Sequence, residues 1–507
     1  MMKFTVKPTD VTKIECDLVT VFASQEKGSE GFVLTDEARK VDQALVGLLT
    51  EIATFQDFEA TPGNTILIHT HGKIGAMRTM LVGLGTAGEL TVANLQTVAA
   101  TAGRKAIGMA VKSLAVSLPL ELSNRFGPEL AAQAMTEGLI LGTYTFSKHK
   151  SADAQRKEKH IEDVFLLTTP PKLDSVAGGI TKGQFVSQAV IFARDLVNEP
   201  PSITTPTYLA DVAKKLVKGN DLMSCDVLTP KEMKTLGMEA LLSIARGSDE
   251  EPRFIKLTYT GGGKKTVCLV GKGITFDTGG LSLKDSKNME TMKLDMAGAA
   301  VILAIFSVLS KLRPKLTVVG LISATENMPG PKAVKPGDIV RAMNGKTIEI
   351  LNTDAEGRVV LADALSYAEA NVKAHAIIDL ATLTGACMVA LGEDVAGMFT
   401  DNEVLGSALT TAAKQSGEFI WGLPLVKEYK EHLKSEIADV KNISSSRYGG
   451  AINGALFLQE FAPKGVPWAH LDIAGPAYAE KDAPLTPKGG TGFGVRMILR
   501  YLQELGS

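Results

Sequence analysis

Four acidic side chains in the second half of the chain fall into two short polar segments. Asp354 and Glu356 are two positions apart in the heptapeptide NTDAEGR, so in an extended backbone both carboxylates lie on the same face. Asp277 and Asp295 belong to an earlier segment that is rich in glycine. Isolated charges beside buried strands are costly to desolvate, and such a group indicates a compensating cation or an ionised substrate. We therefore predict a carboxylate-rich metal site.

The same two segments contain basic side chains. Lys272 and Lys284 flank Asp277, and Arg358 follows Glu356. Lysine binds a metal only as the neutral amine, so from the residues alone Lys272 is better explained as an ion-pair partner of these carboxylates. Arg358 has a planar group suited to bidentate binding of an oxyanion. None of the seven histidines lies in either segment, so the pattern does not indicate a histidine base.

Near-continuous apolar runs predict the sheet that positions these segments. Residues 266–270, 316–322 and 376–380 are typical of central strands that are covered on both faces. Helices are predicted at residues 296–312 and 358–370. In such an α/β sheet, ligands bind beyond the carboxyl ends of the strands. We therefore expect the two polar segments to meet at one edge of the sheet.

Three glycine-containing stretches are predicted to be turns. The glycines at 261–263 are expected to form the turn of a hairpin between two strands. Residues 83–88 fit the pattern GxGxxG after a strand, but no acidic residue follows at the distance that a dinucleotide site requires. A glycine-rich turn is therefore favoured there over a dinucleotide loop. Gly357 is expected to allow a tight turn before the helix that Arg358 begins.

The first third of the chain alternates short apolar strands with amphipathic helices, which is typical of an α/β layer fold with a largely parallel sheet. A long connecting helix is predicted within residues 171–200, ended by Pro200 and Pro201. We predict two α/β domains, an N-terminal domain at residues 1–170 and a second domain at residues 201–507 with a central mixed sheet between helices. Two domains also suit a chain of 507 residues.

Composition limits the classes of function. Lys and Arg number 54 and Asp and Glu 56, and the net charge of -2 removes the electrostatic case for nucleic acid or an anionic membrane as the main partner. No apolar run is expected to span a bilayer and the N-terminus does not resemble a secretory signal, so we predict a cytoplasmic protein. The four cysteines lack paired spacing, which indicates reduced thiols. The basic run 148–160 is predicted to be a solvated surface, with a nucleic-acid patch as the alternative.

The two polar segments resemble those of the leucyl aminopeptidase (cytosol aminopeptidase) family, the dinuclear metallopeptidases of the M17 type. The resemblance is carried by residues 352–361 and 270–295 and extends from about Arg194 to the C-terminus, whereas the N-terminal third matches more loosely. It implies an aminopeptidase that releases leucine and other bulky apolar residues from peptides with a free N-terminus. It also implies an N-terminal domain similar to a macro domain and a homohexamer.

The resemblance further implies a role for each polar residue. One metal ion would be held by Lys272, Asp277, Asp295 and Glu356, and a second by Asp277, Asp354 and Glu356. Lys284 would stabilise the developing oxyanion, and Arg358 would hold a bicarbonate ion that shuttles protons. Lys284, Met292, Thr382 and Gly385 correspond to the substrate-binding residues of the family. Ordinary core packing is the alternative for Met292.

Oxygen ligands with one amine suit manganese or zinc, with magnesium or cobalt as further choices. Two other functions remain open. A two-metal phosphoesterase would use similar carboxylates, although it usually adds histidine ligands. A nucleic-acid-binding regulator that keeps the fold is supported only by the basic run 148–160.

Overall fold

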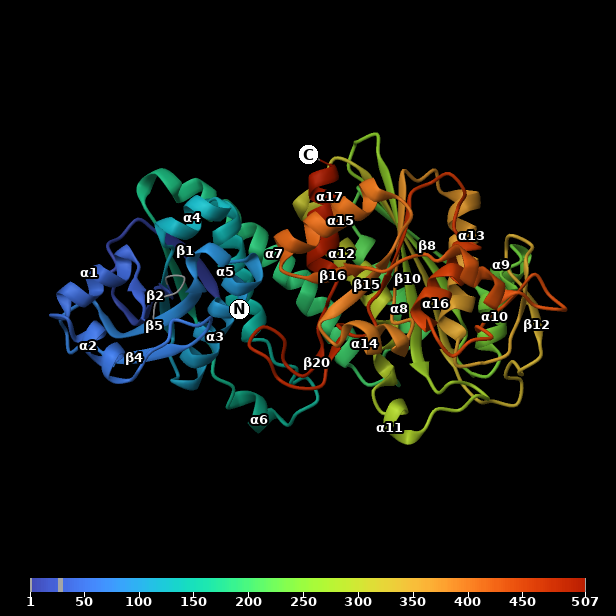
Figure 1. The fold of residues 1–507 in the computed structure, drawn as a ribbon, viewed down its shortest axis with the longest axis horizontal. Coiled ribbons are helices and arrows are strands. Elements are labelled where there is room, and N and C mark those ends of the chain that lie inside the picture. Colours follow the sequence, from blue (N-terminus) through green and yellow to red (C-terminus); the bar gives the residue numbers. More distant parts are fainter. Residues whose placement is uncertain (1, 26–30, 507) are drawn as a thin grey trace. The chain divides into compact units, whose positions relative to one another are not determined.

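The computed structural model describes residues 2–25 and 31–506, which form two compact units (Figure 1). The first unit runs to Gln188 and includes Lys481–Pro487, and the second comprises Ala189–Glu480 and the residues after Pro487. Each unit has its own β-sheet with helices, so the predicted two-domain α/β fold is confirmed. Helix α7 (Leu173–Asn198) continues from one unit into the other, and the boundaries at residues 170 and 201 stay predictions.

The first unit contains a seven-stranded sheet in the order β1-β7-β6-β2-β5-β4, with β3 beside β2. Its strands are β1 (Lys3–Lys7), β2 (Cys16–Gln25), β3 (Val33–Leu34), β4 (Thr65–His69), β5 (Ala76–Thr86), β6 (Ser113–Ser117) and β7 (Asp163–Leu167). The pairings from β1 through β7, β6 and β2 to β5 are parallel, whereas β3 and β4 pair antiparallel to their neighbours. The expectation of a largely parallel sheet is therefore confirmed.

Helices cover both faces of this sheet and enclose two hydrophobic cores. They are α1 (Asp36–Ala44), α2 (Leu48–Phe55), α3 (Val92–Gly108), α4 (Leu120–Phe126), α5 (Pro128–Gly142) and α6 (Ala152–Arg156), with 3-10 turns at Ala87–Glu89 and Pro170–Lys172. Helix α3 begins at a capping box, in which Thr91 accepts from the backbone of Asn94 and the Asn94 side chain accepts from that of Thr91. The basic run 148–160 contains α6, whose residues are all exposed.

Only the end of the glycine-rich stretch 83–88 is a turn, the 3-10 turn at Ala87–Glu89, which corrects part of the expectation from the sequence. Gly83 and Gly85 lie within strand β5, which continues to Thr86. A Cβ atom on Gly83 would lie 2.3 Å from the carbonyl oxygen of Thr61. Glycine is therefore required there because the chain at Thr61 approaches the strand closely.

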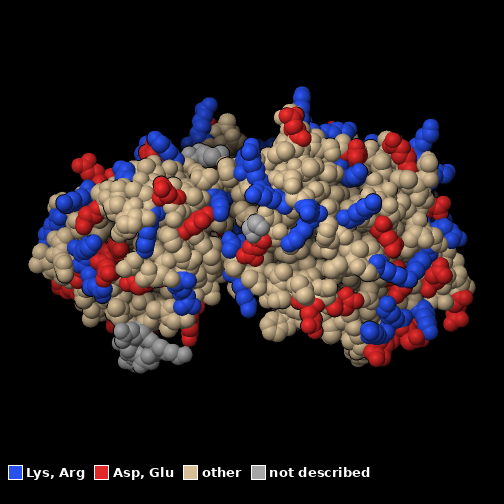
Figure 2. Space-filling view, turned by 90° about the horizontal axis from the view of Figure 1, so that it is seen from above, with Lys and Arg blue, Asp and Glu red and all other residues tan. Residues whose placement is uncertain are grey.

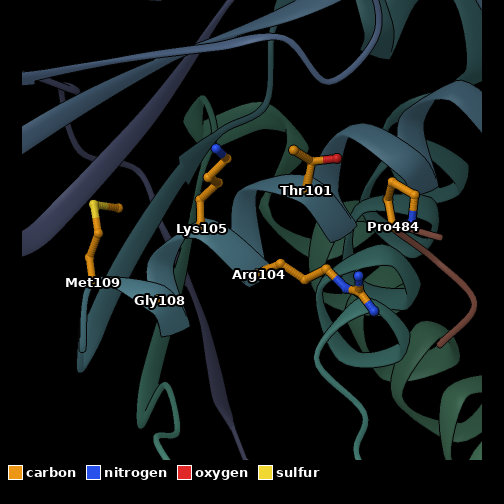
Figure 3. Close-up of a pocket in the computed structure, with 6 residues that line it drawn as sticks. All are labelled: Thr101, Arg104, Lys105, Gly108, Met109 and Pro484. Atoms are coloured by element: carbon orange, nitrogen blue, oxygen red, sulfur yellow. The ribbon is translucent and has the colours of Figure 1, made fainter. Parts of the chain in front are cut away.

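A pocket of about 370 Å³ lies beside α3 in the first unit (Figure 3). Thr101, Arg104 and Lys105 extend from the helix, and Pro484 reaches the pocket from the other end of the chain. The side chain of Arg104 donates through Nε to the carbonyl of Gly142 at 2.9 Å. No carboxylate, histidine or cysteine lines this pocket, so it does not offer a metal site.

The second unit is built on an eight-stranded sheet in the order β16-β15-β18-β14-β10-β11-β9-β8. Its strands are β8 (Met223–Leu228), β9 (Arg253–Thr260), β10 (Thr266–Asp277), β11 (Thr317–Asn327), β14 (Ala376–Ala381), β15 (Val395–Phe399), β16 (Phe419–Gly422) and β18 (Trp468–Asp472). Parallel pairs at the centre and antiparallel pairs toward both sides make the sheet mixed, as predicted. Strands β10 and β14 are almost wholly buried, because both faces of the sheet are covered.

Two groups of helices enclose this sheet (Figure 1). Helices α8 (Pro206–Val217), α12 (Ala297–Leu312) and α17 (Val495–Leu505) pack together on one side. Helices α10 (Glu239–Ala245), α13 (Glu356–Asn371) and α16 (Gly450–Gln459) share one hydrophobic core with the sheet. The remaining helices are α9 (Pro230–Thr235), α11 (Ser286–Met289), α14 (Gly385–Leu391) and α15 (Glu403–Ser416), with 3-10 turns η3 (Met292–Met296) and η4 (Lys427–Leu433). The predicted helices at 296–312 and 358–370 are thus confirmed.

One expectation about strands is wrong. The glycines at 261–263 do not form a hairpin, because β11 lies between β9 and β10 in the sheet. A Cβ atom on Gly263 would lie 1.6 Å from the carbonyl oxygen of Lys315. Glycine is therefore needed in the segment between β9 and β10, because this segment passes close to the backbone just before β11. A separate three-stranded sheet is formed by β12 (Ile339–Arg341), β13 (Thr347–Glu349) and β17 (Val440–Lys441).

One stretch of the described chain, Met292–Leu312, has the length and composition of a membrane span, although no such run was expected. Within the fold, 78% of the most apolar part of this stretch is buried, as is typical of a helix in a protein core. Basic and acidic side chains are interspersed over much of the face seen in Figure 2, in keeping with the net charge of -2.

Candidate active site

Strand β10 positions the first two polar residues. Lys272 lies within the strand and Asp277 ends it, so the strand is longer than the apolar run that predicts it. Its partner β11 is longer in the same way and ends at Asn327, which pairs with Asp277 after an irregularity in the register. Both Lys272 and Asp277 are buried. Asp277 therefore lies where β10 and β11 end, and Lys272 follows the last residue of β10 that pairs with β14, as expected for a ligand site in an α/β sheet.

Lys284 comes from the loop that follows β10. Gly279 and Gly280 have φ of +84° and +61°, values that glycine adopts without strain. The turn closes where the backbone N–H of Lys284 donates to the carbonyl of Thr278 at 2.9 Å. This turn directs Lys284 back toward Asp277. Asp295 comes from the 3-10 turn η3, which leads directly into α12.

The segment that carries Asp354 is an irregular loop and not the extended segment that was expected. Asn352 accepts the backbone N–H of Asp354 at 2.8 Å, and Thr353 donates to the carbonyl of Gly279 at 2.6 Å. The side chain of Asn442 accepts the N–H of Leu351 and donates to the carbonyl of Asn352. These side chains fix the loop because it has no partner strand of its own.

Helix α13 begins at Glu356, two residues earlier than expected. Gly357 is therefore a helical residue and does not form a turn. A Cβ atom on Gly357 would lie 2.6 Å from Cε and Nζ of Lys272, so glycine is required for the passage of the lysine side chain. Glu356 and Arg358 are both buried in the first turn of the helix.

The structure brings all four predicted carboxylates and both lysines together. Ligand atoms of Asp277, Asp354 and Glu356 lie within 4.8 Å of one another. On one side, Lys272 Nζ is 2.7 Å from Asp295 Oδ2 and 2.9 Å from Glu356 Oε1. On the other side, Lys284 Nζ is 2.9 Å from Asp277 Oδ2 and 2.5 Å from Asp354 Oδ1. The two segments thus converge as predicted, and each lysine bridges a different pair of carboxylates.

Burial and mutual repulsion perturb these carboxyl groups. Burial raises the pKa of Asp277 to about 6, and the charge of Glu356 adds to the rise. Burial likewise raises the pKa of Asp295 well above its usual range, against the attraction of Lys272. For Glu356 burial acts in the same direction, but the ammonium groups of Lys272 and Lys284 outweigh it and lower the pKa. The lysines therefore neutralise part of the negative charge and leave the rest uncompensated.

This donor set fits divalent cations. Four ionised carboxylates carry more negative charge than Lys272 and Lys284 neutralise, and repulsion by Glu356 adds to the effect of burial in raising the pKa values of Asp277 and Asp295. Carboxylate oxygens with one amine are suitable ligands for manganese or zinc. Lys272 would bind a metal only after losing its proton. Although burial opposes the charge, Asp295 and Glu356 raise the pKa of Lys272, so a metal ion has to compete with that proton.

Arg358, in the first turn of α13, has a partly unsatisfied guanidinium group. Its Nη1 donates to the carbonyl of Asn442 at 3.1 Å. Its Nε is buried and has no hydrogen-bond partner among the described residues. A buried donor without an acceptor is costly, so the group is suited to bind a small oxyanion.

Of the predicted substrate-binding residues, Lys284 and Thr382 contact the candidate ligands. Thr382 follows β14, and it contacts the candidate ligands directly, because its carbonyl accepts from Lys272 Nζ at 2.9 Å and its hydroxyl donates to Asp295 Oδ1 at 2.7 Å. Met292 begins the 3-10 turn that carries Asp295 and is partly buried. Gly385 begins α14 and is exposed.

Sequence reasoning missed two buried polar residues that support the site. Asn327 donates to Asp277 from the end of β11. Asp472, at the end of β18, accepts the N–H of Leu383 at 3.1 Å and the hydroxyl of Thr384 at 2.7 Å, and so anchors the loop after Thr382. In the sequence, Asn327 and Asp472 can each be recognised as a polar residue at the end of an apolar strand.

Comparisons with known proteins agree with this arrangement. A family model described as "Cytosol aminopeptidase family, catalytic domain" matches residues 191–499, and one described as the N-terminal domain of the same family matches residues 18–153. A probable cytosol aminopeptidase of Alkaliphilus metalliredigens is 40% identical over 507 residues, which is 99% of this chain and 100% of the relative. One from Thermosynechococcus vestitus is 41% identical over 509 residues and all of both chains.

Two solved structures are similar over nearly the whole chain. A mutant of tomato leucine aminopeptidase has a TM-score of 0.88 at 34% identity and covers 99% of this chain and 97% of its own. The bottromycin maturation enzyme BotP in complex with Mn has a TM-score of 0.82 at 34% identity and covers 97% of this chain and 100% of its own.

The fold and the carboxylate-rich site define a metal-dependent aminopeptidase. The chain belongs to the cytosol aminopeptidase family, the M17 peptidases, as the sequence resemblance predicted. Hydrolysis of peptides from the N-terminus is the activity of that class. The comparisons give no support to the phosphoesterase alternative.

Proposed function

We propose that this protein is a leucyl-type aminopeptidase that uses two divalent metal ions. One ion would be held by Lys272, Asp277, Asp295 and Glu356, and the other by Asp277, Asp354 and Glu356. The observation that carries this proposal is the convergence of the four carboxylates within one cluster, with Lys272 on the Asp295 side and Lys284 on the Asp354 side. When bound, the two ions would lower the pKa of a water molecule and polarise the scissile carbonyl.

Lys284 and Arg358 have separate roles: Lys284 stabilises developing negative charge, and Arg358 acts in proton transfer. The side chain of Lys284 is 14% exposed, so its ammonium group has access to a substrate while it stays beside Asp277 and Asp354. There it donates to the oxygen that gains negative charge as the peptide bond is attacked. Arg358 holds a bicarbonate ion through its free Nε, and that ion accepts a proton and returns it to the departing amine.

The substrate is a peptide with a free N-terminus, and leucine or another bulky apolar residue is preferred at that end. Met292 lies in the same 3-10 turn as Asp295, Thr382 donates to Asp295, and Gly385 begins α14 three residues after Thr382; we assign these three residues and Lys284 to substrate binding. Manganese or zinc fills the site, with magnesium or cobalt as substitutes. We further propose a cytoplasmic homohexamer, on the basis of the family. Binding of nucleic acid through residues 148–160 has no specific observation in its favour.

Removal and return of metal tests the proposal. Dialysis against a strong chelator should abolish hydrolysis of leucyl amides and leucyl peptides, and added manganese or zinc should restore it. An N-acetylated leucyl peptide should stay intact, because it lacks the free amine. Activity that persists after both metals are shown to be absent, or equal turnover of the acetylated peptide, would contradict the proposed function.

A further inference from the structure

The amide of Asn327 touches both carboxylates that are proposed as metal bridges. Its Nδ2 is 2.8 Å from Asp277 Oδ1 and 3.5 Å from Glu356 Oε2. The same nitrogen is 3.0 Å from the carbonyl oxygen of Thr353, which precedes Asp354. Asn327 is 1% exposed, so these contacts are made away from solvent. One amide group therefore joins three parts of the candidate metal site.

The backbone leaves this side chain little freedom. Asn327 is the last residue of β11 and is paired with Asp277 of the adjacent strand. Its carbonyl accepts both the N–H of Thr278 at 3.0 Å and the hydroxyl of Thr278 at 2.7 Å. On the other side, a Cβ atom on Gly280 would lie 2.8 Å from Asn327 Oδ1, so glycine at 280 makes room for the amide. The amide group is thereby directed at the carboxylates.

We infer that Asn327 is a positioning residue that holds Asp277 and Glu356 in the orientation in which they bridge the two metal ions. This inference rests on the proposed function. Asp277 Oδ1 accepts from Asn327 at 2.8 Å and from the backbone N–H of Gly279 at 2.9 Å. Oδ2 of the same carboxylate is left to face Lys284 and the cluster. Among the described residues, the hydrogen bonds of Asn327 involve none of Lys284, Thr382 and Arg358.

Two physical effects follow from the amide. As a neutral donor it stabilises two neighbouring carboxylates without adding a charge, which reduces their repulsion before a metal binds. It also removes rotational freedom from Asp277, so less conformational entropy is lost when the ions bind. Replacing a group that orients metal ligands in this way typically lowers the metal affinity by about tenfold to a hundredfold.

The test replaces Asn327 by a side chain of similar size that has no donor. Calorimetric titration of metal-free protein with manganese chloride gives the affinity of each site in the parent and in Asn327→Leu. We expect both binding steps of the variant to weaken by about tenfold or more, because both bridges lose their shared donor. At saturating manganese, the kcat for a leucyl amide should return to within a few-fold of the parent value, since the side chain touches no substrate.

A second variant and a control separate this role from general stability. Asn327→Ser fits the same space with a shorter polar group and is measured in the same way if Asn327→Leu does not fold, with near-UV circular dichroism as the check of folding. Thr400→Val is the control, because the Thr400 hydroxyl donates to the carbonyl of Trp468 at 2.6 Å and no candidate ligand is involved. It should lower the melting temperature while leaving manganese affinity unchanged.

The outcomes distinguish the inference from the function on which it depends. If the parent binds two manganese ions and the folded Asn327 variants bind them as tightly, the positioning role is wrong and the proposed function stands. If Thr400→Val weakens manganese binding as much as the Asn327 variants do, the effect is one of stability and the inference is overturned. A parent chain that binds neither manganese nor zinc overturns both.

Discussion

The first turn of helix α13 lies directly against Lys272, since a Cβ atom on Gly357 would be 2.6 Å from Cε and Nζ of that lysine. Lys272 is 3% exposed at its side chain, so it cannot move away into solvent. The absence of a side chain at Gly357 is thus what allows the ammonium group to reach Asp295 and Glu356. A single glycine couples the geometry of the helix to that of the candidate metal site.

Gly357→Ala should therefore impair the site without unfolding the chain. Alanine favours a helix over glycine by about 1 kcal/mol, which offsets part of the steric cost. We expect weaker manganese binding and lower peptidase activity, because Lys272 is displaced from Asp295 and Glu356. Gly108→Ala is the matched control, since a Cβ on this last residue of α3 meets nothing within 4 Å. Manganese affinity equal to that of the parent in Gly357→Ala would contradict the argument.

The residues of the site could be predicted from the sequence because charge beside apolar strands is a local signal. The runs around Lys272 and Asp277 and around Asp354 and Glu356 are polar within buried surroundings, and the structure brings them together. The loop at Asp354 was predicted as extended backbone, but its shape depends on Asn442, which is distant in the sequence. Conformation set by such distant partners leaves no local pattern.

Sheet order also could not be read from the sequence. The glycines at 261–263 have the composition of a hairpin turn, but β11 pairs with both β9 and β10 and separates them. Pairing of that kind is decided by packing over the whole sheet and not by the turn. For the same reason the role of Asn327 was missed, since its partner Asp277 is adjacent only once β10 and β11 are aligned.

Replacing one outer ligand at a time should distinguish the two proposed metal sites. Asp295 lies beside Lys272 and Thr382, whereas Asp354 lies beside Lys284. We expect Asp295→Asn and Asp354→Asn each to weaken the binding of one manganese ion, and Glu356→Ala to reduce the binding of both. Metal analysis and calorimetry on the purified variants measure this. Full occupancy by two ions in Glu356→Ala would show that Glu356 is not a bridge.

A buried carboxyl group away from the site should make stability depend on pH. Asp363 accepts the backbone N–H groups of Leu241 and Met343, each at 2.8 Å, but burial raises its pKa to about 7. In the unfolded chain the group has its ordinary pKa of 3.8. Between these values the folded protein binds a proton that the unfolded chain has lost, so this group's contribution to stability declines as pH rises from about 4 to about 7.

Asp363→Asn removes that titration and provides the measurement. The free energy of unfolding of the variant relative to the parent should rise with pH between 5 and 7, by at most about 1.4 kcal/mol per pH unit, and should then level off. Urea unfolding at several pH values gives this difference, in which other titrating groups cancel. A difference that stays constant over this range would mean that Asp363 remains ionised in the fold.

Lys284 and Arg358, the two cations that are not proposed as metal ligands, should give different kinetic effects. Lys284 acts on charge that appears only in the transition state, so Lys284→Ala should lower kcat by about a hundredfold or more. Arg358 acts through an exchangeable anion, and acid–base assistance of that kind contributes roughly a hundredfold to ten-thousandfold, part of which water can replace. Arg358→Ala should therefore keep measurable activity and both metal ions.

Rate measured against bicarbonate concentration separates these roles. The parent and any residual activity of Lys284→Ala should rise with bicarbonate, whereas Arg358→Ala should lose most of this response, because the unpaired Nε is part of the proposed anion site. Arg358→Lys is the matched variant, since it keeps the charge but lacks the planar pair of donors, and it should bind bicarbonate more weakly than the parent. If Arg358→Ala responds to bicarbonate as the parent does, then Arg358 serves only to tie helix α13 to Asn442 through its 3.1 Å hydrogen bond, and another group moves the proton.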